Sequence, residues 1–537
     1  MKRGDGRIAR PGRAKASQDL KGHGFQSRRQ AADSRFRPRR EPTLSLDILP
    51  ELSEVFTVDV SRESDVRSLE PALFPARWES SAREMVSMTH KDRFRLVTHL
   101  LLLFALILAF ASAASAEWKE KVLYSFQGGV DAGSVPAGGV VFDKQGNLYV
   151  ATTDGGPKTC VPFSFECGAV YQLSPPATKG GPWTATLIKM FQGEGSKDAS
   201  VPTGGLIIDD AGNLYGVTGY GGTGNCVLFA LAGCGTVYEL SPPKQKGGAW
   251  TETILYSFPT AKQGYLPWGN LVFDSAGNLY GATQFGGGYG SSCDPYYQYC
   301  GAVFELSPPK TKDGKWTEKV LHGFKGGKDG ANPNGGLIVD SKGSIYGTTF
   351  GGGNESGQCG AGGCGTAFEL DPPTDRGGPW NQRQLHVFVD GNDGARPSAG
   401  LIFDVSGNLY GTNVGALFRL APPSKELGRW KETTLYTFDG EALDPEGGLV
   451  FAKNGDLYGT TNFGTGQSLH GSVFRLKPPE QGGAWAFTVI HGFLGPPDGD
   501  FPAASLAFDN VGNLYSTTQG GGGGSCSCGT VFVVSRQ

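Results

Sequence analysis

The amino-acid sequence predicts an all-β chain folded as a seven-bladed β-propeller, with four antiparallel strands in each blade. Close variants of the segment G-N-L-Y-G-T-T occur seven times, and most units end in a Pro-Pro pair. A four-stranded unit of this size cannot cover both faces of its own sheet, so neighbouring copies must cover them. A tryptophan opens each unit, at Trp118, Trp183, Trp250, Trp316, Trp380, Trp430 and Trp485.

Each unit holds four strand-like segments in a fixed order. The first begins at the tryptophan and is rich in Thr and aromatic residues, as in WTETILYSF (250–258), which suits a half-exposed strand. The second is short and apolar, as in GGLIVD (335–340), and suits a strand covered on both faces. The third carries G-N-L-Y, and the fourth, as in GTVYEL (235–240), ends at the two prolines, which cannot donate to a sheet.

Glycines mark the turns of each unit. A D-x-x-G-N turn joins the second strand to the third, as at 274–278, where Gly supplies a positive φ and Asp bonds its own backbone. The double glycine that opens the second strand indicates an innermost strand, since backbones crowd most closely around the axis.

The two ends of the array predict how the ring closes. The array begins with a first-type strand (118–126) and ends with a fourth-type strand (529–534). We predict that these two strands pair in the last blade, with the N-terminal strand outermost, which leaves no open edge. An open solenoid is the alternative, but it needs polar capping units, and neither end has one.

The segment 1–84 is expected to be a disordered basic extension. Residues 1–40 carry 13 Lys or Arg against 3 Asp or Glu, with few apolar residues and no periodicity. A nucleic-acid-binding tail is the alternative, but we expect no nucleic-acid partner because an export signal follows. If translation starts at Met85 or Met88, this extension is not translated at all.

Residues 92–116 join a basic segment to a short apolar run and to small residues that end at Ala116. This is the three-part pattern of a secretory signal, although the run is short for a membrane span. We therefore predict a signal peptide at 85–116, cleaved after Ala116, or else a retained N-terminal anchor. The propeller is predicted to occupy residues 117–537.

All ten cysteines follow this signal and fall in pairs, in loops between the third and fourth strands. Their even number, their pairing by unit and the export signal indicate disulfides. The last pair spans a single residue, which strains a disulfide, and a metal site is the alternative there, without a nearby His. The predicted pairs are Cys160/Cys167, Cys226/Cys234, Cys293/Cys300, Cys359/Cys364 and Cys526/Cys528.

The long loops follow the first and third strands and therefore share one side of the propeller, here called the Cys-loop face. Elaborate loops on a rigid scaffold are a common place for binding. Exposed aromatic residues there suit sugar or peptide contact, although they suit packing on their own loops equally well. The candidate residues are Tyr289, Tyr296, Tyr297, Tyr299, Phe163 and Phe165.

An aspartate recurs a few residues before a proline in the loop after the first strand. A ring of such carboxylates near the channel mouth has the oxygen ligands that suit Ca²⁺. The alternative is a turn-forming Asp, and apart from this calcium site we expect no cofactor or metal. The candidate residues are Asp198, Asp329, Asp393 and Asp498, and Asp131 shares their position.

The histidines favour packing over catalysis. One position of the first strand holds His322, His386 or His491 in three units and Tyr in three others, whereas His470 is a lone candidate in a short loop. No nucleophile elbow, zinc-protease motif, phosphate loop or dinucleotide fingerprint stands in a suitable context. The sequence therefore predicts a protein that is not an enzyme.

Taken together, these segments resemble the GloVer tandem-repeat family of exported bacterial proteins, over about residues 118–537. The resemblance implies a surface or secreted protein of uncharacterised function. The G-x-x-x-D-x-x-G-N-x-Y pattern is also similar, more distantly, to NHL-type and gluconolactonase-like propellers. Metal-lactonase members of that group use single Glu, Asn and Asp ligands at the channel, and no such unique set can be placed on this sequence.

Our leading hypothesis is a secreted, periplasmic or cell-surface propeller that binds a glycan, peptide or protein on its Cys-loop face. One alternative is a hydrolase or lyase, lactonase-like and metal-assisted, at the channel mouth, and another is a structural cell-surface module. We expect a monomer that touches a membrane only through its N-terminal segment, if that segment is retained.

Overall fold

The computed structural model describes residues 117–536, which belong to one compact unit of the chain, Phe110–Gln537. The predictions for residues 1–116, a disordered extension and a signal peptide or anchor, fall outside the described residues. Within the described range there are gaps at 130–131, 157–166, 179, 193–197, 229–230, 246, 288–299, 313, 355–358, 376, 425–427, 439–441, 465–468, 481 and 525.

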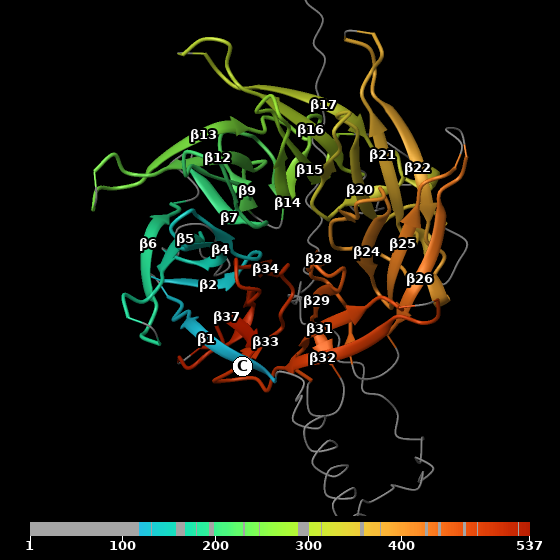
Figure 1. Cartoon of the computed structure of the whole chain (residues 1–537). Coiled ribbons are helices and arrows are strands. Elements are labelled where there is room, and N and C mark those ends of the chain that lie inside the picture. Colours follow the sequence, from blue (N-terminus) through green and yellow to red (C-terminus); the bar gives the residue numbers. More distant parts are fainter. Residues whose placement is uncertain are drawn as a thin grey trace, which may run out of the picture. The chain divides into compact units, whose positions relative to one another are not determined.

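Seven antiparallel sheets surround a common axis, which confirms the predicted seven-bladed propeller (Figure 1). From the axis outward, each sheet runs from an inner edge through the G-N-L-Y strand and the fourth-type strand to a tryptophan strand. Blades 1 to 3 consist of β2 (Gly133–Pro136), β3 (Val141–Phe142), β4 (Leu148–Gly155), β5 (Ala169–Ser174) and β6 (Thr184–Met190); of β7 (Ala199–Pro202), β8 (Ile207–Ile208), β9 (Leu214–Gly221), β12 (Thr236–Ser241) and β13 (Thr251–Ser257); and of β14 (Tyr265–Phe273), β15 (Leu279–Phe285), β16 (Ala302–Ser307) and β17 (Thr317–Gly323).

The remaining four blades repeat this order. They consist of β18 (Ala331–Pro333), β19 (Ile338–Val339), β20 (Ile345–Gly351), β21 (Thr366–Asp371) and β22 (Asn381–Val387); of β23 (Ile402–Phe403), β24 (Leu409–Asn413), β25 (Ala416–Ala421) and β26 (Lys431–Thr437); of β28 (Val450–Phe451), β29 (Leu457–Thr461), β31 (Ser472–Lys477) and β32 (Ala486–Gly492); and of β34 (Ala507–Phe508), β35 (Leu514–Thr518), β37 (Thr530–Arg536) and β1 (Trp118–Ser125).

Short elements lie in the long loops of the Cys-loop face. Three pairs of two-residue strands and three 3₁₀ helices are found there within the described residues. They are β10 (Val227–Leu228) with β11 (Leu231–Ala232), β27 (Ala442–Leu443) with β30 (Phe463–Gly464), β33 (Gly499–Asp500) with β36 (Gly520–Gly521), and η3 (Gly327–Asp329), η4 (Gly360–Gly362) and η5 (Gly391–Asp393).

The inner edge is the part of the blade that differs from the prediction. In blade 4, β19 covers only two residues of the predicted second strand, and β18, from the preceding loop, pairs with the other half of β20. Gly335 and Gly336 separate the two pieces. A Cβ on Gly335 would lie 2.4 Å from the carbonyl oxygen of Ala399 in the next blade. The predicted crowding of the glycine pairs around the axis is therefore confirmed, and it interrupts the strand.

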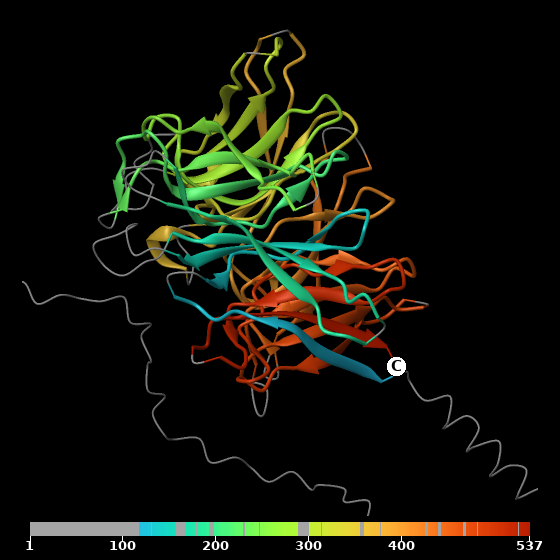
Figure 2. The ribbon, with the colours of Figure 1, turned by 90° about the vertical axis from the view of Figure 1, so that its left-hand side faces the viewer.

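The ring closes as predicted, because β1 pairs antiparallel with β37. Val122 stands opposite Phe532, and Tyr124 stands opposite Val531, with a bulge between them. Both views show the blue β1 beside the red C-terminal strand (Figures 1 and 2). Blade 7 thereby gains the same outermost tryptophan strand as the other blades.

The repeated G-N-L-Y segment builds the seams between blades. In blade 5, Asp404 accepts hydrogen bonds from the backbone of Asn408 (2.9 Å), from its side chain (2.7 Å) and from the Tyr410 hydroxyl (3.2 Å). The Tyr410 ring, held in this way, packs edge-on against Phe451 and Trp485 of blade 6, with ring centroids 5.1 and 6.2 Å apart. The same set of hydrogen bonds recurs at Asp143, Asp209, Asp274 and Asp509.

A second seam contact lies nearer the Cys-loop face. In blade 7, the N–H of Phe501 donates to the carbonyl of His470 in blade 6 (3.1 Å), and Pro502 packs on Gly471. Phe501 has a φ of 57°, a left-handed conformation that non-glycine residues seldom adopt. The residue before the inner-edge proline has a φ of 52° to 59° in all seven blades, at Val135, Val201, Leu266, Asn332, Arg396, Asp444 and Phe501.

The predicted disulfides are confirmed wherever both cysteines are described, including the pair for which a metal site was the alternative. Cys167 and Cys300 are also disulfide-bonded, while their predicted partners, Cys160 and Cys293, lie outside the described residues. Such bonds are typical of oxidising compartments outside the cytoplasm. Across the described ranges, no helix has the length and apolar character needed to span a bilayer. The bonded pairs are Cys226–Cys234, Cys359–Cys364 and Cys526–Cys528.

Two glycines of blade 6 test the seam contact. Gly471 and Gly455 have φ values of 86° and 87°. A Cβ on Gly471 would lie 2.5 Å from Pro502 Cδ across the seam and 2.4 Å from the Thr461 carbonyl oxygen in its own blade, whereas one on Gly455 would meet nothing within 4 Å. We expect Gly455→Ala to cost about 1–2 kcal/mol of unfolding free energy from backbone strain alone. Gly471→Ala should cost roughly 1–3 kcal/mol more. Thermal unfolding midpoints measure the difference, and equal midpoints would contradict the seam contact.

Candidate functional site

The four candidate aspartates lie at different seams, beside outermost strands, and the structure does not bring them together. Each pairs with a basic side chain on the tryptophan strand that precedes its own loop. None of the four is among the residues that line the cavity on the axis. The pairs are His322–Asp329 (3.1 Å), His386–Asp393 (3.1 Å), His491–Asp498 (3.5 Å) and Lys189–Asp198 (3.2 Å).

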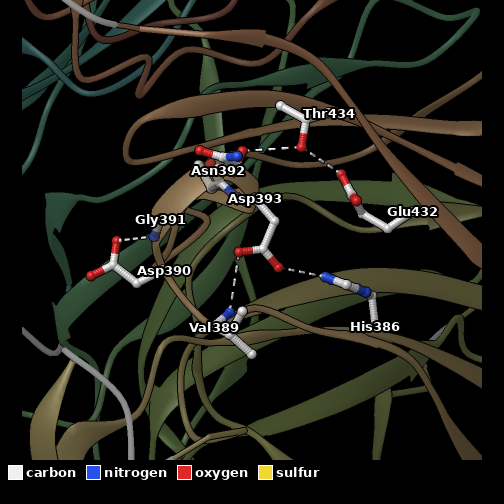
Figure 3. A network of polar contacts seen from close by, with 9 residues as sticks. His386, Val389, Asp390, Gly391, Asn392, Asp393, Glu432 and Thr434 are labelled. Atoms are coloured by element: carbon white, nitrogen blue, oxygen red, sulfur yellow. Dashed lines mark hydrogen bonds and ion pairs between the residues drawn. The ribbon is translucent and has the colours of Figure 1, made fainter.

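Each of these aspartates also shapes its own loop, as the turn-forming interpretation expects. Asp393 accepts a hydrogen bond from the backbone N–H of Val389 at 3.3 Å while it faces His386 (Figure 3). Asp329 accepts in the same way from the N–H of Lys325 at 2.8 Å. The carboxylate therefore joins the loop to the outermost strand of the same blade.

A third side chain reaches this pair from the next blade. Glu432, two residues after Trp430 on β26, faces His386 and Asp393, and it accepts a hydrogen bond from the Thr434 hydroxyl at 3.2 Å (Figure 3). Burial raises the pKa of Glu432 above its usual value. The cluster thus spans the seam between blades 4 and 5.

In each seam, the residue equivalent to His386 meets the residue equivalent to Glu432 in the next blade, and the two change together from seam to seam. Tyr256 donates a hydrogen bond to Glu318 at 3.2 Å, whereas Tyr436 stacks on Phe487 with ring centroids 4.3 Å apart. A hydroxyl meets a carboxylate in one seam, and two aromatic rings meet in another. These complementary pairs identify the position as a packing site of the fold.

His470 is also part of a seam. It occupies the place that the second cysteine of the loop takes in other blades, and its Nδ1 lies 3.0 Å from Asp500 Oδ1 in blade 7. Its carbonyl accepts the seam hydrogen bond from Phe501. The candidate aromatic residues Tyr289, Tyr296, Tyr297, Tyr299, Phe163 and Phe165 lie outside the described residues.

A cavity of about 460 Å³ lies on the propeller axis, and the inner edges of all seven blades form its wall. The residue after the inner-edge proline lines it in every blade, between that proline and the glycine pair or its replacement. These seven equivalent positions hold six different residue types. They are Ala137, Thr203, Trp268, Asn334, Ser398, Glu446 and Ala503.

Trp268 and Glu446 give the cavity its distinct chemistry. The Trp268 side chain is 37% exposed, unlike the buried aromatic residues of the core. Burial, together with the smaller effect of the Asp444 charge, raises the pKa of Glu446 to about 7. The side-chain amide of Asn462 donates to the Glu446 carboxyl at 3.1 Å. The carboxyl is therefore held in one position and carries a proton in part of the molecules near neutral pH.

Further side chains line the cavity toward the Cys-loop face. Phe350 and Gln519 stand at the ends of G-N-L-Y strands, and the exposed Arg396 lies over the Phe350 ring at 5.8 Å. The site therefore combines aromatic surfaces with amide, hydroxyl and carboxyl groups, which suit a polar ligand with an apolar face.

Comparison with known proteins gives one family match. The model of the Gloeobacter/Verrucomicrobia repeat matches residues 112–293 and 231–442. The chain belongs to this repeat family. The resemblance to GloVer proteins is thereby confirmed, while the more distant likeness to NHL-type propellers stays a prediction. No match was found among curated proteins.

One solved structure is titled "Calcium structure of Trichoderma reesei Carbohydrate-Active Enzymes Family AA12". It aligns with 79% of this chain and 96% of its own chain, at 13% sequence identity and a TM-score of 0.35. A likeness at this level carries no argument about activity.

Two signals in this Gloeobacter/Verrucomicrobia repeat chain were open to sequence reasoning and were missed. The three histidines and their aspartates are each seven residues apart, as His322 and Asp329 are. The cavity position is framed in each repeat by a proline and small residues and differs between blades, so comparing repeats column by column would have found Trp268 and Glu446.

Replacing Glu446 by Gln tests the pKa of this buried carboxyl. Its pKa of about 7 in the folded state lies above the ordinary value of 4.5, so the folded state binds the proton more tightly. The protonated Glu446 side chain therefore contributes its full amount to the free energy of unfolding below about pH 4.5, and this contribution is lost as the pH rises through 7.

We expect the difference in unfolding temperature, Glu446→Gln minus wild type, to become more positive as the pH increases from 5 to 8. Thermal unfolding of both proteins across this range is the measurement. Asp375→Asn, at an exposed carboxylate on the opposite face, is the control and should run parallel to the wild type. A Glu446→Gln curve that also runs parallel would show that this group does not titrate in that range.

Proposed function

We propose that this protein is an exported binding protein whose axial cavity takes a sugar unit of a glycan. One observation carries the proposal: seven equivalent positions around the cavity hold six residue types, among them a single exposed tryptophan. A position needed only for the fold repeats with the rest of the unit, or it changes together with its partner in the next blade, whereas Trp268 is exposed at the cavity wall. The variation is therefore attributed to a ligand that lacks sevenfold symmetry.

The chemistry of the wall suits a carbohydrate. The Trp268 indole offers a rigid apolar surface for the C–H face of a sugar ring. Asn334 and Ser398 offer an amide and a hydroxyl group, which donate and accept hydrogen bonds as sugar hydroxyls require. The Thr203 hydroxyl is already donated to the Pro267 carbonyl at 2.6 Å. A volume of about 460 Å³ lies within the range of small-ligand pockets.

The surroundings are consistent with a glycan partner outside the cytoplasm. The disulfides of the Cys-loop face suit an oxidising compartment. A glycan held in the cavity by one unit would continue over the same face, where the long loops lie. A peptide or protein partner on this face is the broader form of the same hypothesis.

A hydrolase or lyase is the second candidate, and Glu446 is the observation that favours it. A carboxyl with a pKa of about 7 inside a cavity has the properties of a general acid or base. In this alternative, Glu446 transfers a proton to or from a substrate bound beside Trp268. A purely structural cell-surface module is the outcome if no ligand is found.

Trp268→Ala tests the binding proposal. The purified protein is screened against a glycan array, and the affinity for any hit is measured by titration calorimetry. We expect Trp268→Ala to weaken binding at least tenfold, because it removes the apolar contact surface. The matched control is Leu494→Ala, which removes an exposed apolar side chain from the same face but outside the cavity wall.

Two further variants separate the alternatives. Deletion of residues 289–299 should leave binding intact if the cavity is the site, and it should abolish binding if the loop is the site. Glu446→Gln should retain binding under the proposal, whereas loss of turnover with binding retained would establish the enzymatic alternative. Equal affinity of Trp268→Ala and wild type would rule out the cavity.

A further inference from the structure

Three potential metal ligands meet at the seam where the ring closes. Glu120 lies on β1, the closing strand, while His491 lies one residue before the end of β32 in blade 6 and Asp498 lies in the loop that follows. One ligand atom from each lies within 4.8 Å of the other two. The side chains of His491 and Asp498 are 20% and 17% exposed, so the cluster is shielded but reachable from solvent.

The polar groups of this cluster do not satisfy one another. Glu120 Oε1 and Asp498 Oδ1 are buried, and neither has a hydrogen-bond partner in the part of the chain that the structure describes. The His491–Asp498 contact is 3.5 Å long, compared with 3.1 Å for His386–Asp393. The other oxygen of Asp498 accepts a hydrogen bond from the backbone N–H of Leu494 at 3.1 Å. Two buried carboxylate oxygens without a partner are still costly, so this arrangement favours a cation between them.

In equivalent seams a side chain of the protein contacts the glutamate, although one oxygen of Glu252 and one of Glu318 also lack a hydrogen-bond partner among the described residues. Between blades 1 and 2, the Lys189 ammonium forms an ion pair with Glu252. Between blades 4 and 5, Thr434 donates its hydroxyl to Glu432. On β1, the residue four positions after the tryptophan is Val122, which has no polar group to give to Glu120.

We propose that Glu120, His491 and Asp498 bind one divalent cation of the zinc type. An imidazole nitrogen with two carboxylate oxygens is a ligand set that Zn²⁺ accepts, with water in the fourth position. Ligand atoms around tetrahedral zinc lie roughly 3.4 Å apart at the usual bond lengths, so the three side chains need to move by only about 1 Å.

The location gives this cation a role in closing the ring. Glu120 belongs to the N-terminal strand that completes blade 7, whereas His491 and Asp498 belong to blade 6. A cation held by all three ties the closing strand to the neighbouring blade. Because the site exists only in the closed propeller, binding stabilises the closed form.

Zinc binding to the full chain, purified without a polyhistidine tag and treated with chelator, is the test. We expect about one zinc per chain by elemental analysis, and an unfolding temperature that rises on addition of ZnCl₂. Glu120→Gln should lower zinc affinity at least tenfold and remove that rise. Glu432→Gln, in the equivalent cluster between blades 4 and 5, is the matched control and should bind zinc as the wild type does.

An unchanged unfolding temperature, or an equal rise in Glu120→Gln and wild type, would overturn the proposal. A larger rise with CaCl₂ or MgCl₂ than with ZnCl₂ would also overturn it, since those cations prefer all-oxygen sites. If Glu120→Gln does not fold, cobalt spectroscopy of the wild type decides the matter. Visible d–d bands that zinc displaces are expected, and their absence contradicts the site.

Discussion

The pairing of β1 with β37 is the contact on which the rest of the propeller depends. β1 completes blade 7, and it also supplies core to both flanking seams. Trp118 packs on Tyr458 of blade 6, with Arg536 over its ring at 4.7 Å, and Phe126 just after β1 packs on Tyr171 of blade 1. Every other seam joins consecutive blades, but this strand joins the two ends of the chain, so all seven seams form together or one stays open.

Much of this architecture could be predicted because the residues that build each blade and each seam recur in every unit. A residue such as Tyr410 recurs in every unit since each unit supplies one half of an identical seam. The inner edge could not be predicted in the same way. Val135 and Val201 are β-branched, and local propensity argues against the positive φ that they adopt. Their backbone N–H groups donate to carbonyl groups of the preceding blade, at 2.9 Å in both cases, and these bonds hold the conformation. Such contacts between distant residues cannot be predicted from the local sequence.

The candidate site was predictable only in part, for a related reason. The spacing between His386 and Asp393 is visible within one repeat, but their third partner, Glu432, arrives from the next unit along the chain. Rare motifs and residues that recur are the two kinds of signal that mark function within one sequence. The cavity residues Trp268 and Glu446 are neither, because each is a single departure at a position that other blades fill with small or polar side chains.

The two kinds of position obey different constraints, and this difference is the basis of the proposed binding site. At a seam, a change on one blade demands a matching change on its neighbour, as the pairs Lys189–Glu252 and Tyr436–Phe487 show. The residue after the inner-edge proline lines the cavity instead, where part of its surface has no neighbouring blade to match. Thr203 and Asn334 nevertheless also bond to a neighbouring blade, at 2.6 Å to the Pro267 carbonyl and at 3.1 Å to the Gln284 amide. A ring of such positions allows one stable scaffold to present many different surfaces. Under the proposed function, changes that favour a ligand accumulate at positions such as Trp268 and Glu446 with little cost to the seams.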